Sequence, residues 1–172
     1  MLDPQVIFDN VDIDNIADIA DFGCGPGFLA IPLAMHSQGI IHCFDVLPQA
    51  LETVDAKARA EGLKNVMTNR VNLCAPNGSD LEGDSVALVI MRNILWQNEE
   101  KEKLLEEARR ILEETGQLLL IGWSKGDLPI GPPEKARITQ EQMIALAEDN
   151  SFTITKKFTV SEYHYAVVAQ KK

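Results

Sequence analysis

The sequence predicts an α/β fold in which a largely parallel sheet is covered by helices. Short apolar runs alternate with segments of helical periodicity, which is typical of such sheets. A glycine cluster separates the first apolar run from the first helical segment. The last two apolar runs leave no room for a crossover helix between them, so they must pair antiparallel.

Apolar runs define the expected strands. The run 86–91 is the most apolar, so we expect it at the centre of the sheet with both faces covered. In chain order, strands are expected at 16–22, 39–44, 65–71, 86–91, 118–122, 152–157 and 164–169. Ligands of parallel sheets bind beyond the carboxyl ends of the strands, so we expect the functional residues there.

Proline, glycine and apolar spacing define the first two helices. Pro32 lies in the first turn of the helix expected at 28–36, where a missing N–H does little harm. Pro48 opens the helix expected at 48–61, and Gly62 ends it.

The strongest helical pattern covers 99–112, with Asn98 as the expected N-cap. Its apolar face comprises Leu104, Leu105, Ala108, Ile111 and Leu112, and its solvent face comprises Glu100, Lys101, Glu107 and Arg110. Thr115 and Gly116 are expected to interrupt the helical pattern before the next strand. The last helix, 140–149, has Thr139 as its expected N-cap.

Length and composition predict a single domain, 1–172, with a very short N-terminal extension. The net charge of −10 would repel phosphate backbones, so nucleic acid is an unfavoured partner. The N-terminus lacks a basic flank followed by an apolar stretch, so no secretory signal is expected. No apolar run approaches the roughly 18 residues of a membrane span, and we expect a cytoplasmic protein.

The three cysteines, Cys24, Cys43 and Cys74, show no paired spacing. Reduced, partly buried thiols are the expected reading, and no metal site is predicted. A three-thiolate metalloid site is the alternative that these residues leave open.

The clearest functional pattern is the segment from Asp21 to Gly27, Asp-Phe-Gly-Cys-Gly-Pro-Gly, between a strand and a helix. Glycines at alternate positions let the backbone turn tightly and approach a ligand. Asp45 ends the next strand, where a carboxylate can accept hydrogen bonds from both hydroxyls of a ribose. Together these residues predict a pocket for an adenosine-type cofactor.

The identity of that cofactor depends on Asp21 and Pro26. Residues 25–30 fit the dinucleotide pattern G-x-G-x-x-A, so an NAD-dependent oxidoreductase is one alternative. Pro26, however, removes a backbone donor from a pyrophosphate cradle. A carboxylate at Asp21 can instead attract the ammonium group of a cofactor that carries an amino acid.

The chain resembles class I S-adenosylmethionine-dependent methyltransferases. The resemblance rests on these motifs, on the segment Cys-Phe-Asp-Val-Leu-Pro at 43–48 and on the two consecutive strands expected at the end of the sequence. Segments 108–112, 131–133 and 163–167 are similar to the small-molecule group that includes ubiquinone/menaquinone C-methyltransferases and arsenite methyltransferases. The resemblance implies a Rossmann-like seven-stranded mixed sheet of order 3-2-1-4-5-7-6, with strand 7 antiparallel and helices on both faces.

The resemblance also implies cofactor contacts, position by position. The methionine portion would be held by Asp21, Gly23, Cys24, Gly25 and Gly27, the ribose by Asp45, and the adenine by Val46, Leu47, Asn72 and Leu73. Arg92, Asn93 and Ile94 would line the far side of the cofactor. Many relatives have an acid at the position of Asn72, so we expect altered adenine binding here.

The implied reaction moves a methyl group to a small or medium-sized acceptor by alignment of donor and acceptor, so no catalytic acid–base pair is assigned. Trp96 and Trp123 are expected at strand ends facing the crevice, and Lys125, Tyr163 and His164 are further substrate candidates; plain packing or solvation is the alternative for each.

The sequence offers few residues before the glycine motif that could cover the acceptor pocket. Segment 1–10 can supply about one helical turn, so the pocket is expected to be open, covered by the loop 126–133, or closed by a second copy of the chain. A cofactor-binding module that transfers nothing is the remaining alternative.

Overall fold

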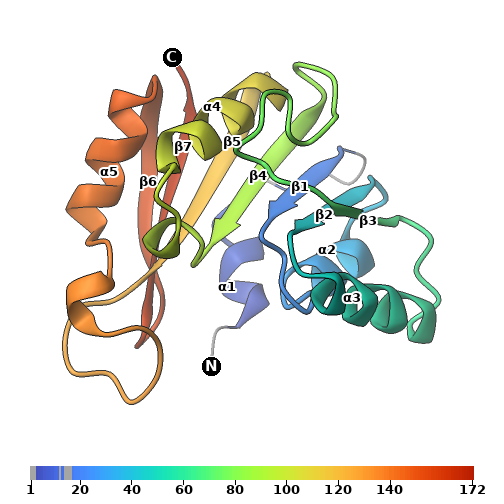
Figure 1. Cartoon of the computed structure of the whole chain (residues 1–172), viewed down its shortest axis with the longest axis horizontal. Helices are drawn as coiled ribbons and strands as arrows, with labels where there is room; N and C mark the ends of the chain where they lie inside the picture. Colours follow the sequence, from blue (N-terminus) through green and yellow to red (C-terminus); the bar gives the residue numbers. More distant parts are fainter. Residues whose placement is uncertain (1–2, 12, 14–16) are drawn as a thin grey trace.

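The computed structural model describes residues 3–11, 13 and 17–172. Figure 1 shows a twisted sheet with helices on both sides. The sheet has seven strands in the order β3-β2-β1-β4-β5-β7-β6, and β7 is antiparallel to both of its neighbours, which confirms the expected fold class. The strands are β1 (Ile19–Phe22), β2 (Ile41–Asp45), β3 (Val66–Arg70), β4 (Val86–Arg92), β5 (Leu112–Trp123), β6 (Phe152–Ser161) and β7 (His164–Lys171).

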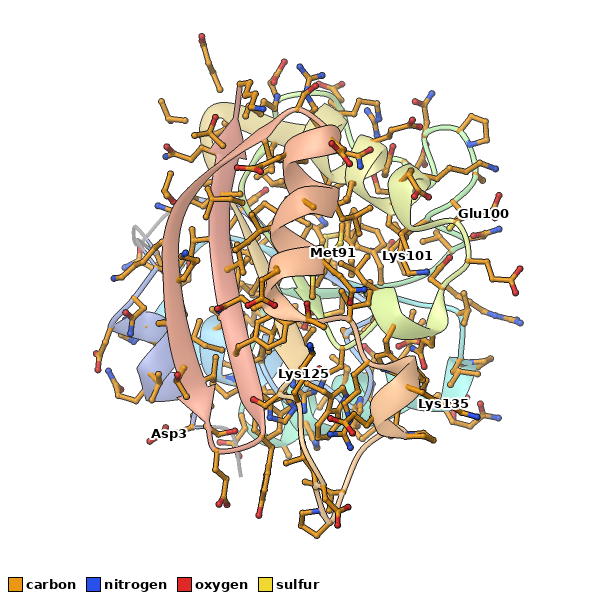
Figure 2. All side chains as sticks on the ribbon, turned by 90° about the vertical axis from the view of Figure 1, so that its left-hand side faces the viewer. Asp3, Met91, Glu100, Lys101, Lys125 and Lys135 are labelled. Atoms are coloured by element: carbon orange, nitrogen blue, oxygen red, sulfur yellow. The ribbon has the colours of Figure 1, made fainter. Side chains whose placement is uncertain are left out.

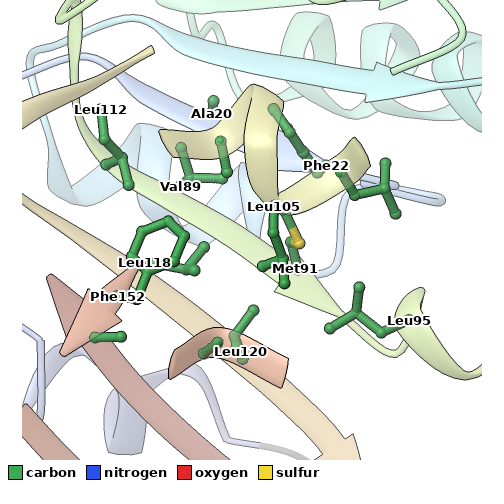
Figure 3. Close-up of a cluster of buried hydrophobic side chains, with 14 of the residues drawn as sticks. Ala20, Phe22, Val89, Met91, Leu95, Leu105, Leu112, Leu118, Leu120 and Phe152 are labelled. Atoms are coloured by element: carbon green, nitrogen blue, oxygen red, sulfur yellow. The ribbon is translucent and has the colours of Figure 1, made fainter. Parts of the chain in front are cut away.

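Helices cover the two faces in separate groups (Figure 1). They are α1 (Pro4–Phe8), α2 (Ala30–His36), α3 (Pro48–Ala60), α4 (Lys101–Ile111) and α5 (Gln140–Asp149), with short 3₁₀ helices η1 (Leu95–Gln97) and η2 (Glu134–Ala136). Apolar residues of α1, α2 and α3 form one buried cluster with alternate strand residues. Those of α4 and α5 form the second cluster, shown in Figure 3. Among the residues described, every helix is too short or too polar to cross a membrane.

β4 lies at the centre of the sheet, as its apolar sequence predicts. Successive residues of a strand point to opposite faces, so Ile90 packs in the first cluster and Met91 in the second. Thr139 caps α5 with its side chain accepting from the N–H of Gln142, and the reciprocal bond completes a capping box, which confirms that expectation.

Several expected boundaries were wrong. α2 begins at Ala30 rather than at residue 28, and β1 begins at Ile19, with Ile16 outside the described residues. The N-cap of α4 is Glu100, not Asn98, whose Oδ1 instead accepts from the N–H of Glu100 at 2.9 Å.

The expected break at Thr115 and Gly116 is also wrong. β5 starts directly after α4 and continues through both residues. The pairing with β4 is irregular there, between Val86 and Leu88, and a Cβ on Gly116 would lie 3.2 Å from the carbonyl of Ala87. A glycine in a strand can mark such a bulge with close backbone approach, and the sequence pattern alone resembles a turn.

Glu107, expected on the solvent face of α4, is buried. It accepts hydrogen bonds from the N–H and the hydroxyl of Ser79, at 2.9 and 2.5 Å, and pairs with Arg110 at 2.7 Å. Burial alone would raise the pKa of Glu107, but the hydrogen bonds from Arg110 and Ser79 outweigh burial and lower it. Glu107 therefore fastens the loop between β3 and β4 to α4.

We expect Glu107→Ala to lower the free energy of unfolding by about 2–3 kcal/mol, because buried hydrogen bonds to a charged group are lost and Ser79 loses its acceptor. Exposed Glu106, one residue earlier, is the matched control, and its replacement by alanine should change stability by less than about 0.5 kcal/mol. Urea denaturation of both variants checks this. Equal losses of stability in the two variants would show that the buried contacts of Glu107 do not stabilise the fold.

Candidate functional site

The carboxyl ends of β1, β2 and β4 meet at one edge of the sheet and surround a pocket of about 130 Å³. The pocket has mainly apolar walls, with a carboxylate and several amides among them. It is lined by Gly23, Phe44, Asp45, Val46, Val71, Asn72, Leu73, Cys74, Ile94, Gln97, Asn98 and Leu104. Such a lining suits a flat aromatic group with polar edges.

Asp45 is held in place by the backbone around it. Its Oδ2 accepts from the N–H of Gly25 at 3.0 Å, and its Oδ1 accepts from the N–H of Leu47 at 2.9 Å. Each carboxylate oxygen can accept more than one hydrogen bond. Both oxygens are therefore oriented by the protein, and both can still accept hydrogen bonds from the hydroxyl groups of a ligand.

The glycines of the 23–27 loop have different surroundings. A Cβ on Gly23 would lie 2.3 Å from Cγ2 of Ile94, and one on Gly27 would lie 3.1 Å from Cγ2 of Val54 in α3. Gly25 has φ +54°, and a Cβ built on it meets nothing within 4 Å. Gly23 and Gly27 thus permit close packing, whereas Gly25 faces open space beside Asp45.

Asp21 is a buried carboxyl, 2% exposed, at the end of β1. Its pKa is raised from 3.8 to about 7, chiefly by burial; the positive charge of Arg92 opposes this rise, and the negative charge of Asp45 adds to it. A buried carboxylate is stabilised by a cation brought next to it. Asp21 therefore suits a positively charged group of a ligand.

Two consecutive residues at the carboxyl end of β4 carry polar atoms without hydrogen-bond partners. Nε of Arg92 and Oδ1 of Asn93 are buried and have no hydrogen-bond partner among the described residues. Burial lowers the pKa of Arg92, and its guanidinium lies 4.6 Å from the centre of the Phe28 ring. Buried polar groups normally have partners. An amino-acid group would match these atoms, with its ammonium at Asp21 and Asn93 and its carboxylate at Arg92.

Of the two tryptophan candidates, one is at a strand end as expected and the other is not. Trp96 lies in η1 and not at a strand end. Trp123 does end β5, but its ring lies 4.2 Å from that of His164, and a Cβ on Gly131 would lie 2.8 Å from it. The 124–137 loop thus packs onto Trp123, and buried Arg137 fastens the loop by donating to the carbonyls of Pro132, Ser124 and Gly126.

The remaining substrate candidates do not gather around the pocket. Lys125 is exposed and lies at the same end of the sheet as Lys135, as Figure 2 shows. Tyr163 lies in the turn between β6 and β7 and is partly exposed. Neither residue lines the pocket.

Six of the expected cofactor contacts line the pocket: Gly23, Asp45, Val46, Asn72, Leu73 and Ile94. Gly25 donates its N–H to the pocket residue Asp45, and Asp21 interacts electrostatically with Asp45 and Arg92. The thiol of Cys24 is buried in the first core cluster, and Leu47 is exposed. Gln97 and Asn98 also line the pocket, although sequence reasoning gave Asn98 only a capping role; their place after the carboxyl end of β4 was the available signal.

The three cysteines fall into two groups. Cys24 and Cys43 pack in the first core cluster, and Cys74 packs in the second, beside Asn98. The described residues contain no cluster of three side chains suited to a metal ion. The three-thiolate alternative therefore has no support from this arrangement.

Comparisons with known proteins agree with this geometry. Residues 19–116 match a family model described as a methyltransferase domain. The ribosomal protein L11 methyltransferase of Methylococcus capsulatus is 30% identical over 107 residues, which cover 62% of this chain and 33% of that protein. The chain thus matches about a third of that curated relative.

Solved structures share the whole fold. A SAM-dependent methyltransferase from Aquifex aeolicus superposes with a TM-score of 0.91 at 22% identity, over 99% of this chain and 90% of the other. A Sulfolobus solfataricus protein assigned to the type 11 methyltransferases gives a TM-score of 0.81 at 24% identity, over 99% and 93% of the two chains.

Proposed function

The chain belongs to the methyltransferase domain family, and we propose that it transfers a methyl group from S-adenosylmethionine to a small or medium-sized acceptor. The observation that carries the proposal is a group of charged and polar side chains at the carboxyl ends of β1 and β4. The buried carboxyl of Asp21 interacts with Arg92 and with the pocket residue Asp45, and Nε of Arg92 and Oδ1 of Asn93 have no hydrogen-bond partner among the described residues. An amino-acid group attached to a nucleoside matches both the charges and the pocket.

We assign the parts of the cofactor to this chain as follows. The ammonium lies at Asp21, the carboxylate at Arg92 and the ribose hydroxyls at Asp45. The adenine lies between Val46 and Leu73, with the amides of Asn72 and Asn98 at its edge; this use of pocket residues is supported by their shared lining. Gly25 leaves room for the methionine chain where its sulfur joins the ribose.

The residues of this chain bind and orient rather than react. When bound, S-adenosylmethionine supplies a methyl group already activated by a positive sulfur. Asp45 holds the ribose and Asp21 the amino-acid end of the cofactor, and the apolar walls of the pocket pack against the adenine. Holding reactants in line is a large part of catalysis for such a transfer.

A small molecule is the first candidate for the acceptor. The quinone and arsenite subgroups both stay predictions, as do a single domain over 1–172 and closure of the pocket by a second copy of the chain. A protein acceptor is the second candidate, because a relative named for ribosomal protein L11 is 30% identical over the matched segment. NAD binding is not favoured, because a dinucleotide needs no ammonium partner such as Asp21.

The proposal is tested by thermal-shift and transfer assays on the same preparation. S-adenosylmethionine and S-adenosylhomocysteine should raise the unfolding temperature, and NADH should not. A panel of small acceptors and ribosomal protein L11 then tests transfer of a labelled methyl group. Stabilisation by NADH alone would favour the oxidoreductase, whereas cofactor binding without any transfer would favour the binding module.

Asp45→Ala should weaken S-adenosylhomocysteine binding by about 1.5–3 kcal/mol, because it removes the ribose acceptors and frees the N–H groups of Gly25 and Leu47. Exposed Glu52 on α3 is the control for a lost negative charge, and Glu52→Ala should leave affinity unchanged. Calorimetry measures both. Unchanged affinity in a folded Asp45→Ala protein would show that Asp45 does not bind the ribose.

A further inference from the structure

His164 is the first residue of β7 and is buried, and both of its ring nitrogens have hydrogen-bond partners. Nε2 lies 3.0 Å from Nδ2 of Asn93, and Nδ1 lies 3.1 Å from Oγ of Ser161. Asn93 is 71 positions earlier in the chain. The ring therefore connects the β6–β7 hairpin to the end of β4, beside the site described above.

The direction of these hydrogen bonds follows from the charge of the ring. Burial, together with the positive charge of Arg92, lowers the pKa of His164 to about 4, so the ring is neutral at neutral pH. A neutral imidazole has one donor and one acceptor, and an amide nitrogen can only donate. Nε2 therefore accepts from Asn93, and Nδ1 donates to Ser161.

This contact fixes the amide of Asn93. Its backbone has φ +57°, and its N–H donates to the carbonyl of Ile121 at 2.9 Å. Because Nδ2 is held by His164, Oδ1 is directed away from the ring, and it is the buried oxygen without a partner among the described residues. A free amide could rotate by half a turn and exchange its donor for its acceptor.

We infer that His164 is a positioning residue that holds the amide of Asn93 with its oxygen directed toward the ammonium group of S-adenosylmethionine. The inference rests on the proposed function. It assigns His164 no contact with the cofactor and no proton transfer.

A purely structural role is the competing explanation, because His164 also packs on Trp123 and bonds Ser161. Two amide variants separate these roles. The side-chain amide of glutamine reaches the position of Nε2 and can accept from Asn93, whereas that of asparagine reaches only the position of Nδ1 and keeps the bond to Ser161.

The experiment is calorimetry with S-adenosylhomocysteine on wild type, His164→Gln and His164→Asn, with thermal unfolding of each. We expect His164→Asn to weaken binding about tenfold, the effect of one lost hydrogen bond, and His164→Gln to restore affinity to within about threefold of wild type. Equal affinities of the two variants would overturn the inference.

A double-mutant cycle gives the second readout. Asn93→Ala should weaken binding, and His164→Asn should then cause no further loss, because its effect acts through Asn93. Additive losses would show that His164 acts independently of Asn93. Failure of wild type to bind the ligand would contradict the proposed function itself, whereas binding by wild type with additive or equal losses contradicts only the role of His164.

Discussion

Asp21→Asn is expected to weaken S-adenosylhomocysteine binding about 100-fold and to make the ligand-free protein more stable at neutral pH. The loss of affinity follows from removal of the negative charge proposed to face the ammonium group. The gain in stability follows from removal of a carboxylate that is 2% exposed. A variant that is at once more stable and worse at binding is typical of a functional site.

The pH dependence of stability has a definite sign. Burial raises the pKa of Asp21 from 3.8 to about 7, so between these values the folded protein binds the proton more tightly than the unfolded chain does. The Asp21 contribution therefore declines as pH rises from about 4 to about 7, by on the order of 2–4 kcal/mol. Asp21→Asn should stabilise the protein at pH 8 and have little effect at pH 4, as measured by urea denaturation.

Ligand binding should show the opposite trend with pH. The ammonium group requires ionised Asp21, whose pKa in the free protein is about 7, so affinity should fall as pH drops below 7 and binding should release a proton. Asp21→Asn should remove that pH dependence. Asp55→Asn, on α3 and bonded to Thr68, is the matched control, and it should keep both affinity and pH dependence. If Asp21→Asn binds S-adenosylhomocysteine like wild type, Asp21 does not contact the ammonium group.

Gly25→Ala is expected to lower affinity for S-adenosylhomocysteine about 10- to 100-fold, because the added methyl group enters space assigned to the cofactor. The fold itself has room, since a Cβ at Gly25 meets nothing within 4 Å. Backbone strain remains, because φ is +54° there, and it should cost about 1–2 kcal/mol of stability.

Gly62 is a closely matched control for that strain. It follows α3 with φ +68°, and a Cβ on it also meets nothing within 4 Å. Gly62→Ala should therefore lower stability by a similar amount and leave affinity unchanged. Calorimetry and thermal unfolding of the two variants compare both effects, and equal affinities would mean that the open space at Gly25 holds no ligand.

The sheet and the centre of the site were predictable because their signals are local. The glycine run after β1 and the aspartate that ends β2 can each be recognised within a few residues, and parallel pairing brings the two strand ends together. Thr139 was also predictable, since a capping box is complete within four residues.

Long-range contacts were not predictable in the same way. Glu107 has the spacing of a solvent-facing residue, and it is buried only because the loop containing Ser79 folds over α4. Asn93 and His164 meet across 71 positions, and no local pattern indicates that they form a pair. Gly116 resembles a helix stop until its close approach to Ala87 is seen.

A crystal structure of the protein with S-adenosylhomocysteine tests the central claim most directly. The account predicts the ribose on Asp45, the ammonium within hydrogen-bond distance of Asp21 and Oδ1 of Asn93, and the carboxylate at Nε of Arg92. A ligand bound with its amino-acid end away from Asp21 and Arg92, or protein side chains filling the space beside Gly25, would contradict it.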